Sequence, residues 1–367
     1  MKANIVFFAP LKNKIPSDKI GGAEMGCLKT LEIYEQNGVS VELLSKPSKT
    51  AGLLSYVVGM LFVPVKLFFI LLRGNFSFVH IVGFYRNVVY LEWILMQLTR
   101  LRKKKVVYEV RNGSMVESFQ KGRFIYKKVL KDLLLKPEIV LCQGMEYVDF
   151  IKEKWDIQRT YYPNFLQSEF LPSEYRQRAE GDTVRVVYFG RVTKSKNVLL
   201  MIDVLHILLK SNIKAELIII GASNEEYENQ INRKISETQL TSFVNVEGRK
   251  NIKEIVEYLK TSHYFLFPTN EPQEGHSNSL TEAMGLGVVP VVSNKGFNAS
   301  ICGRKELVVD GFDPQSYAEK IIGIEKTGLW QFYSKYVQDR VKDNYTQQIV
   351  STQLINAISR ELDDEEK

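Results

Sequence analysis

Two glutamates bracket a short polar segment in the second half of the chain. Residues 274–285 read EGHSNSLTEAMG, with Glu274 at the start and Glu282 near the end, and lie between apolar runs at 264–267 and 288–292. Each run is typical of a buried strand, and the segment ends in a helix start. Where a strand leads through a polar loop into a helix, unpaired backbone N–H groups point outward and bind anions. The spacing therefore predicts an anion-binding loop.

A pair of cations follows an earlier strand in the same half. Arg191 and Lys196 come after the apolar run 185–189. Guanidinium and ammonium groups at the carboxyl end of a strand are suited to neutralising a diphosphate without a metal ion. The Gly-, Ser- and Asn-containing loop between the two glutamates can offer backbone N–H groups to the same phosphates. Together the two loops predict a site for a nucleoside diphosphate.

The first half of the chain holds weaker candidates. Gly21 and Gly22 fall where a predicted strand at 4–9 passes into a helix, and glycine there lets the backbone approach a phosphate closely. Polar side chains also lie within or directly after two further predicted strands: His80, Glu109, Arg111 and Asn112. We interpret these four as possible acceptor-side residues. For His80 and Glu109, packing in the core is as consistent with the sequence as catalysis.

The scaffold for these loops is an alternation of apolar strands and amphipathic helices, which runs to about residue 165 and then restarts. The predicted strands are 4–9, 39–44, 78–82, 105–110, 139–142, 185–189, 216–220, 244–246, 264–267 and 288–292. Helices are predicted at 198–210 and through most of 330–358. Such alternation indicates parallel sheets covered on both faces. The fold class is therefore α/β, with two Rossmann-like domains facing across a cleft.

Composition shifts mark the expected domain boundaries. We expect a first domain at 1–166, a polar linker at 167–182, a second domain at 183–335, and a helical segment with an acidic tail at 336–367. The chain has 367 residues, of which 45% are hydrophobic and 25% charged, as in a soluble globular protein. Its three cysteines lie far apart without CxxC spacing, so neither a disulfide framework nor a zinc site is indicated. That pattern fits the cytosol, and the first ten residues indicate a strand rather than a signal peptide.

The net charge of +7 is concentrated in one region of the first half. Basic residues between 100 and 136 far outnumber acidic ones: Arg100, Arg102, Lys103, Lys104, Lys105, Arg111, Lys121, Arg123, Lys127, Lys128, Lys131 and Lys136 against Glu109, Glu117 and Asp132. A basic surface indicates an anionic partner such as phospholipid, lipid pyrophosphate or nucleic acid. A set of solvated helix faces is the alternative interpretation.

Residues 53–72 are the most apolar stretch of the chain. Their length would suffice for a membrane span, but Pro64 and Lys66 fall in the middle and polar flanks are sparse. Because the stretch lies between two predicted strands, we expect a buried helix or a helix in the membrane interface rather than a span.

Several motifs, taken in order, resemble one enzyme family. GGAE at 21–24, FGR with the following lysine at 189–196, YPN at 162–164, and E-x7-E at 274–282 followed by Ala-Met are similar to family 4 of the retaining GT-B glycosyltransferases. The order and spacing agree over nearly the whole chain. Within the family, the bacterial enzymes that build capsule, O-antigen and other surface polysaccharides are the most similar. GHSNS at 275–279 departs from the common pattern, in which an aromatic residue and a glycine follow the first glutamate.

The resemblance implies a role for each matching residue. Arg191 and Lys196 would bind the donor diphosphate and stabilise the leaving nucleotide, Glu274 would contact the transferred sugar, and Glu282 would accept hydrogen bonds from the ribose. The implied catalytic residues are Arg191, Lys196 and Glu274. The implied donor-binding set is Gly22, Gly190, Arg191, Lys196, Glu274, His276, Ser277, Asn278, Ser279, Leu280 and Glu282. The C-terminal helix would return to the first domain, and no metal or other cofactor is expected.

The implied partners are a nucleotide-sugar donor, a lipid-linked or oligosaccharide acceptor and an anionic membrane surface, with no nucleic acid. The expected location is the cytoplasm, peripheral on the inner face of the cytoplasmic membrane. Two other classes stay open: a nucleotide-sugar 2-epimerase of similar fold, and an inactive membrane-associated binding protein. A Rossmann oxidoreductase is disfavoured because no GxGxxG follows a strand. Each site residue also has a structural alternative, notably a capping box formed by Ser279 and Glu282.

Overall fold

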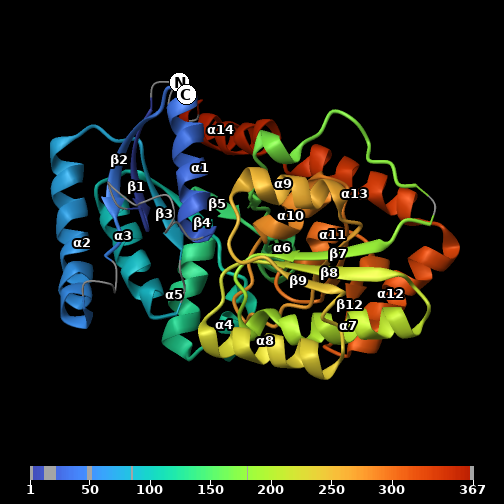
Figure 1. The fold of residues 1–367 in the computed structure, drawn as a ribbon. Coiled ribbons are helices and arrows are strands. Elements are labelled where there is room, and N and C mark those ends of the chain that lie inside the picture. The colour runs from blue at the N-terminus through green and yellow to red at the C-terminus, as the bar shows by residue number, and fades with distance from the viewer. Residues whose placement is uncertain (1–2, 12–21, 48–51, 84–85, 180, 364–367) are drawn as a thin grey trace. The chain divides into compact units, whose positions relative to one another are not determined.

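The computed structural model describes residues 3–11, 22–47, 52–83, 86–179 and 181–363, which form two compact units (Figure 1). The first unit comprises Met1–Pro163 and Val350–Lys367, and the second comprises Asn164–Ile349. The residues predicted as a linker, 167–182, group with the second unit. The last helix groups with the first.

The first unit is built on a parallel sheet in the order β2-β1-β3-β4-β5-β6. Its strands are β1 (Asn4–Ala9), β2 (Ser40–Ser45), β3 (Phe78–Gly83), β4 (Lys105–Val110), β5 (Ile139–Cys142) and β6 (Thr160–Tyr161). The central strands are continuous apolar runs, as expected for a sheet that is covered on both faces. In β1, every residue from Ile5 to Ala9 is fully buried.

Helices connect these strands and cover the sheet. They are α1 (Gly22–Gln36), α2 (Leu53–Arg73), α3 (Val89–Leu101), α4 (Met115–Lys121), α5 (Phe124–Leu135), α6 (Met145–Trp155) and α14 (Gln347–Asp363), with a 3-10 turn η3 (Arg86–Val88). Figure 1 shows α2, α3 and α5 side by side, and α3 contacts both of the others. Right-handed crossovers place these three on one face of the sheet and α1 on the opposite face.

The second unit repeats the architecture with the strand order β12-β11-β10-β7-β8-β9. Its strands are β7 (Val184–Phe189), β8 (Ala215–Ile220), β9 (Val244–Val246), β10 (Tyr264–Phe267), β11 (Val289–Ser293) and β12 (Val308–Val309). Its helices are α7 (Val198–Lys210), α8 (Glu225–Glu237), α9 (Ile252–Thr261), α10 (Asn278–Gly285), α11 (Asn298–Cys302), α12 (Pro314–Thr327) and α13 (Trp330–Asn344), with 3-10 turns η4 (Ser168–Phe170), η5 (Lys194–Lys196) and η6 (Lys305–Leu307). The helix α7 contacts α8 and α12, whereas α10 contacts α13.

The predicted fold class is confirmed, because both halves are parallel six-stranded α/β sheets. The helix predicted through 330–358 consists of two helices, α13 and α14, which are separated at Tyr345. Val350, Leu354 and Ile358 of α14 are fully buried, and Lys105 Nζ of β4 lies 3.7 Å from Glu361 Oε2. The C-terminal helix therefore packs on the first unit. Gly21 and the end of the predicted acidic tail, 364–367, lie outside the described residues.

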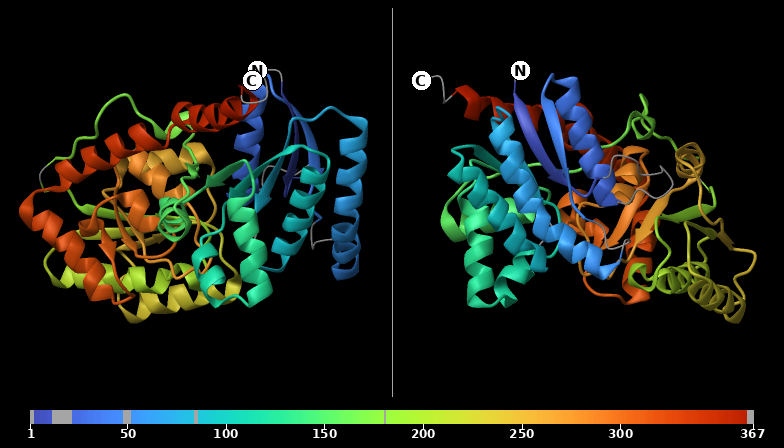
Figure 2. Two further views of the ribbon diagram at one scale, coloured as in Figure 1. Left: turned by 180° about the vertical axis from the view of Figure 1, so that it is seen from behind. Right: turned by 90° about the vertical axis from the view of Figure 1, so that its left-hand side faces the viewer.

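Of the two alternatives expected for residues 53–72, a buried helix and a helix in the membrane interface, the first is wrong. These residues form α2, a continuous helix that includes Pro64, and only Val63, Leu67 and Leu71 are buried. Figure 1 and the left view of Figure 2 show α2 at the outer edge of the first unit, and in the right view of Figure 2 α2 runs across the front. By length and composition alone, α2 is long and apolar enough to cross a membrane. Only 11% of its most apolar window is buried in the structure.

A histidine directly before β10 is held in its neutral form inside the second unit. The Nδ1 of His263 accepts a hydrogen bond of 2.9 Å from the backbone N–H of Arg185, and its ring lies edge-on to Trp330. Burial, and after it the nearby cations Arg178, Arg176 and Arg185, together lower the pKa of His263 from 6.5 to about 3.

This histidine is expected to make stability depend on pH. The unfolded chain protonates His263 near pH 6.5 while the folded chain keeps it neutral, so the unfolded state binds more protons and stability rises with pH in this range. Acidifying from pH 7 to pH 5 should lower the free energy of unfolding by about 2 kcal/mol through this group. In His263→Asn the amide oxygen can accept the same hydrogen bond without titrating, so urea unfolding should show a smaller pH dependence. An equal loss in the variant would contradict the assignment.

Candidate active site

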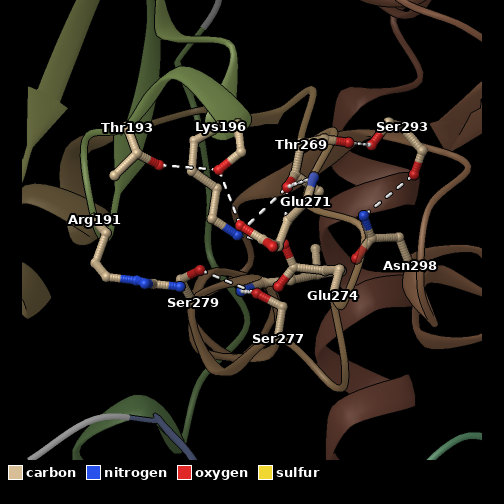
Figure 3. A network of polar contacts seen from close by, with 12 residues as sticks. Arg191, Thr193, Lys196, Thr269, Glu271, Glu274, Ser277, Ser279, Ser293 and Asn298 are labelled. Atoms are coloured by element: carbon tan, nitrogen blue, oxygen red, sulfur yellow. Dashed lines mark hydrogen bonds and ion pairs between the residues drawn. The ribbon is translucent and has the colours of Figure 1, made fainter. Parts of the chain in front are cut away.

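The sequence-predicted donor residues come together at one edge of the second sheet. The strands β11, β10 and β7 are neighbours and parallel, so their carboxyl ends meet at that edge. The loop after β7 carries Arg191 and Lys196, and the loop after β10 carries Glu274. Side chains that are 78 positions apart in the chain are therefore brought into contact there (Figure 3).

Lys196 and Glu274 form an ion pair. The Nζ of Lys196 contacts Glu274 Oε2, and the two side chains are only 8% and 11% exposed. Thr269 completes the cluster, because its hydroxyl donates a hydrogen bond of 2.8 Å to the same carboxylate oxygen and lies 3.4 Å from Lys196 Nζ. The ammonium also lies 5.0 Å from the centre of the Phe267 ring, a cation–π contact. The partly desolvated ammonium of Lys196 is thus held at the strand ends by the carboxylate of Glu274.

Further polar residues form hydrogen bonds around this ion pair. The Ser195 hydroxyl donates to Glu271 at 2.9 Å, and the Ser293 hydroxyl donates to the Thr269 carbonyl at 2.6 Å. The side chain of Asn298 in turn donates to the Ser293 carbonyl. Thr269, Glu271, Ser293 and Asn298 were not singled out from the sequence. The only local sign that they belong to a site is their polar side-chain type close to the ends of two apolar strands.

The loop after β10 is fixed by a glycine of the next loop. Gly296 adopts φ +57°, and a Cβ there would lie 2.2 Å from the Glu274 carbonyl oxygen. Only glycine lets the two backbones approach this closely. The main chain of Glu274 is therefore positioned by the loop after β11 as well as by its own strand.

The amino terminus of α10 follows the same loop, and it excludes the structural alternative in which Ser279 and Glu282 form a capping box. Ser277 is the N-cap, and its hydroxyl accepts from the backbone N–H of Leu280. Ser279 lies inside the helix, with its hydroxyl 3.1 Å from that of Ser277, and Glu282 lies one turn further on and is half-buried. Glu282 therefore does not cap the helix. Arg191 is exposed, and its side chain extends toward Ser279 in Figure 3.

His276 and Asn278 are held by residues far from them in the sequence. The amide nitrogen of Asn164 donates to the His276 carbonyl and to the Asn278 side chain, both at 2.9 Å. The buried His276 ring lies edge-on to Tyr345 at 5.0 Å. His276 thus packs into the unit. Leu280, also in the predicted donor set, is fully buried.

The loop that carries Arg191 is packed against the loop after β8. The backbone N–H of Gly190 donates to the Ile220 carbonyl, and that of Val192 donates to the Ala222 carbonyl. Gly221 adopts φ +151°, and a Cβ there would lie 1.8 Å from the Gly190 carbonyl oxygen. No side chain can be accommodated without moving one of the two loops.

Replacing Gly221 with alanine is therefore expected to lower stability by about 3 kcal/mol and to displace Gly190 and Arg191. Gly248 is a matched control, since it also has positive φ but has no heavy atom within 4 Å of the position that a Cβ would occupy. Gly248→Ala should cost only about 1 kcal/mol, the strain of the left-handed conformation. Chemical denaturation of both variants distinguishes steric contact from strain: equal losses would contradict the close approach.

The candidates of the first unit form a buried network. Glu109 Oε1 lies 2.5 Å from Arg111 Nε, and Glu109 Oε2 lies 3.2 Å from His80 Nε2. The other ring nitrogen of His80 is 2.7 Å from the Tyr34 hydroxyl. Arg111 donates to Thr30 at 2.9 Å and to the Gly26 carbonyl at 3.1 Å, which ties β4 to α1.

Burial and charge set the protonation states in this network. Burial lowers the pKa of His80, so the ring is neutral. Burial opposes ionisation of Glu109, but the Arg111 guanidinium and His80 together hold the pKa of its carboxyl below the usual range. Glu109 and His80 are directed toward each other and toward Arg111, all three buried, whereas Asn112 is half-buried and accepts from Ser114. Gly22 is the first residue of α1.

No group of three or more His, Cys, Asp or Glu side chains with the spacing of a metal site occurs in the part of the chain that the structure describes. The polar side chains at the donor edge include the carboxylates of Glu271 and Glu274, the cations of Arg191 and Lys196, and the hydroxyls of Ser195, Thr269 and Ser277. These groups can bind a diphosphate and sugar hydroxyls directly.

Comparison with known proteins finds glycosyltransferases similar to this chain. Residues 174–340 match the family model for glycosyl transferases group 1. The capsular polysaccharide biosynthesis glycosyltransferase CapH of Staphylococcus aureus is 24% identical over 298 residues, which cover 77% of this chain and 80% of that protein. A second S. aureus protein of the same description, CapM, is 26% identical over 192 residues, covering 52% of this chain and 49% of CapM.

Solved structures share the fold over the whole chain. Sucrose-phosphate synthase of Thermosynechococcus elongatus has a TM-score of 0.73 at 15% identity and covers 99% of this chain and 100% of its own. Anabaena Alr3699/HepE in complex with UDP and glucose has a TM-score of 0.67 at 14% identity and covers 98% and 100%. The predicted resemblance and fold are confirmed. Residues 174–340 match the glycosyl transferases group 1 model and the chain has the GT-B fold, and together these findings support a transferase enzyme.

Proposed function

We propose that the protein transfers a sugar, with retention, from a nucleoside-diphosphate sugar (UDP- or GDP-linked) to a lipid-linked or growing surface-polysaccharide acceptor, such as capsule, O-antigen or exopolysaccharide. The observation that carries the proposal is the Lys196–Glu274 pair at the strand ends of a glycosyl transferases group 1 domain. The acceptor class is supported by the two S. aureus relatives, both described as capsular polysaccharide biosynthesis glycosyltransferases.

In this proposal each donor-side group has a separate task. Transfer breaks the bond between the anomeric carbon and the diphosphate oxygen, and negative charge grows on that oxygen. The ammonium of Lys196 and the guanidinium of Arg191 stabilise this charge, so the barrier falls without a metal ion. Glu274 accepts hydrogen bonds from the sugar hydroxyls and Glu282 from the ribose. The acceptor hydroxyl attacks the same face of the sugar and gives its proton to the leaving phosphate.

The ion pair has a consequence for donor binding. Without ligand, Lys196 is neutralised by Glu274, and both are partly desolvated. A diphosphate that contacts Lys196 must share the ammonium with this carboxylate or displace it. The donor's sugar hydroxyls then replace one of the hydrogen bonds that Glu274 loses. A complete nucleotide sugar should therefore bind with an advantage over the bare nucleoside diphosphate that depends on Glu274.

A thermal-shift panel of UDP, GDP, ADP and their sugars tests the donor assignment. The nucleotides and nucleotide sugars that carry one of the three bases should raise the melting temperature of the protein, and the rise should grow with ligand concentration. A ligand that binds the folded state stabilises it by mass action. No shift with any nucleotide would argue against the transferase proposal.

The same donor, once found, tests the main alternative. We expect the donor sugar to remain unchanged when it is incubated with the enzyme alone, and to be consumed when a polysaccharide acceptor fraction is added. Epimerised donor formed without acceptor would instead support the 2-epimerase.

We further propose that the protein works at the inner face of the cytoplasmic membrane. A lipid-linked acceptor is carried by the membrane, and the exposed apolar helix α2 and the basic residues 100–136 are suited to an anionic bilayer.

A further inference from the structure

The connectivity of the first unit decides how α2 can meet a membrane. The strands before and after it, β2 and β3, both pair in parallel with β1. A helix that crossed a bilayer would place its two ends on opposite sides, whereas both ends of α2 continue into one sheet. Spanning would therefore require the sheet to come apart. The helix can meet a membrane only along its side.

The sheet-facing side of α2 is narrow and firmly packed. Val63, Leu67 and Leu71 are spaced four residues apart and are at most 3% exposed. Gly59 faces Pro47, and a Cβ there would lie 2.9 Å from the proline ring. These contacts leave the remaining circumference of the helix outside the core.

The outer side of α2 is almost entirely apolar. Its exposed large side chains include Leu54, Leu61 and Phe62, which are 79%, 71% and 58% exposed. The full set, which we name the α2 face, is Leu53, Leu54, Val57, Val58, Leu61, Phe62, Val65, Phe68, Phe69 and Leu72. The neighbouring helix α3 extends it with exposed Tyr90, Ile94 and Leu101. A continuous apolar face of this kind is unusual on a soluble monomer and marks an interaction surface.

A groove with two cations adjoins this face. It lies between β2 and the C-terminal half of α2 and has a volume of about 500 Å³. Its apolar walls include Leu44, Val65, Phe69 and Ile70, and its charged groups are Lys66 and Arg73. Neither cation forms an ion pair with any residue in the described ranges, and both are exposed. Their charges are therefore available to an external anion.

The combination of an apolar wall and unpaired cations matches one chemical class. A phospholipid presents a phosphodiester directly above the first carbons of its acyl chains, so the groove's cations and apolar walls can be satisfied at the same time. A second copy of this chain fits less well, because a two-fold contact pairs this surface with itself, and neither the α2 face nor the groove lining contains an acidic side chain that could pair with Lys66 and Arg73. Exposed cations of α5, Lys128 and Lys131, are likewise without ion pairs among the described residues and add positive charge to the same helical layer.

We infer that α2 lies in the plane of an anionic bilayer surface and that the groove between β2 and α2 binds the phosphodiester of one anionic lipid through Lys66 and Arg73. This inference rests on the proposed membrane-borne acceptor and specifies which part of the chain contacts lipid. The α2 face enters the acyl boundary, while the sheet and the rest of the first unit stay in water.

Vesicle flotation tests the inference on the full chain. The protein should float with vesicles of phosphatidylcholine plus phosphatidylglycerol and remain in the soluble fraction with phosphatidylcholine alone. Lys66→Gln/Arg73→Gln should weaken binding to the anionic vesicles about 30-fold, since each cation near such a surface contributes on the order of 1 kcal/mol. Leu61→Ser/Phe62→Ser should weaken it at least about 10-fold through the loss of apolar contact. All four positions are exposed, so the variants should fold normally.

The matched control is Lys210→Gln/Lys214→Gln, which removes the same charge from exposed positions of the second unit and should leave vesicle binding within about twofold. Equal effects of the two glutamine pairs, or equal binding to both kinds of vesicle, would overturn the groove as a site for an anionic lipid. Release from vesicles by millimolar inorganic phosphate would assign the groove to free phosphate instead. Dimerisation in solution that the Leu61→Ser/Phe62→Ser variant abolishes, without vesicle binding by the parent protein, would assign the face to a second copy.

Nucleotide thermal shifts on the same variants separate this inference from the proposed function. The groove variants should show the parental shift, because the donor edge is in the other unit. A parental shift with lost vesicle binding supports the lipid site. Vesicle binding by a protein that no nucleotide stabilises would leave the lipid site standing and overturn the transferase proposal.

Discussion

Replacing Lys196 with methionine is expected to lower the rate of sugar transfer by about 1,000-fold. The ammonium is fixed at the donor edge by contacts to Glu274, Thr269 and the Phe267 ring. A fixed, partly desolvated cation stabilises growing negative charge without reorganising, which is where such groups contribute most to a reaction rate. Methionine keeps the length and apolar contact of the side chain while removing its charge. Initial rates with a saturating donor measure the effect.

The control for this prediction is in the same 3-10 turn. Lys194 is exposed and pairs with the exposed Glu226, at 3.3 Å. Lys194→Met should leave the rate within about twofold, because an exposed ion pair of this kind contributes little. A similar loss in both variants would mean that the turn as a whole, and not the Lys196 ammonium, supports transfer.

Removing the partner of Lys196 separates binding from transfer. Glu274→Gln abolishes the charge that neutralises Lys196 but keeps a side chain that can accept hydrogen bonds. A bare nucleoside diphosphate should then bind at least as tightly as to the parent protein, while transfer falls. In Lys196→Met, by contrast, nucleotide binding should weaken. Calorimetric titration measures the affinity of each variant for the nucleoside diphosphate. The change in affinity should have opposite signs in the two variants if the pair acts as proposed, and the same sign if both residues are only structural.

Ten of the twelve described strands were predicted because their apolar runs are local, whereas the two-residue strands β6 and β12 were missed. The predicted bounds of β1, β4, β5, β9 and β10 agree with the structure residue for residue. Right-handed βαβ connection then follows from the order of the elements. The two donor loops could also be predicted, since a polar loop after a parallel strand must lie at the same edge as its neighbours.

The contacts within the site could not be predicted from that level of information. That Lys196 pairs with Glu274 depends on β7 and β10 being neighbours, and nothing local to either loop states this. Ser277 and not Ser279 caps α10, because the helix begins earlier than the S-x-x-E pattern indicates. The exposure of α2 was hidden for a related reason. Hydropathy measures how apolar a helix is but not how much of its circumference the fold covers.

The stability of the first unit is expected to depend strongly on Glu109. Glu109→Ala should lower its free energy of unfolding by about 3–5 kcal/mol, the usual cost of leaving a buried partner charge uncompensated. Glu109 is 1% exposed, and it is the carboxylate that faces both Arg111 and His80. Its loss would leave the Arg111 guanidinium buried beside neutral partners, Thr30 and the Gly26 carbonyl. Urea unfolding followed by Trp93 and Trp155 fluorescence reports on this unit.

Acid should reveal the same interaction. Because the folded pKa of Glu109 is held below its unfolded value of 4.5, the unfolded state binds the proton first as the pH falls. The stabilisation is therefore complete above about pH 4.5 and is lost as the pH falls toward the folded pKa. The alanine variant lacks this group and should lose less stability over that window. The exposed pair of Glu117 and Lys121 supplies the control, since Glu117→Ala should cost less than about 0.5 kcal/mol.

A double-mutant cycle decides whether charge or packing is responsible. In Glu109→Ala/Arg111→Met no buried charge is left without a partner, so the double variant should be more stable than the sum of the two single losses implies, by about 2 kcal/mol. Additive losses would mean that the two side chains contribute only volume. Arg111 also holds the Gly26 carbonyl of α1, the helix whose first residue is Gly22. A coupling energy of this size would therefore mean that charge stabilises the Glu109–Arg111 pair, whose arginine contacts the helix on which a proposed substrate-binding residue lies.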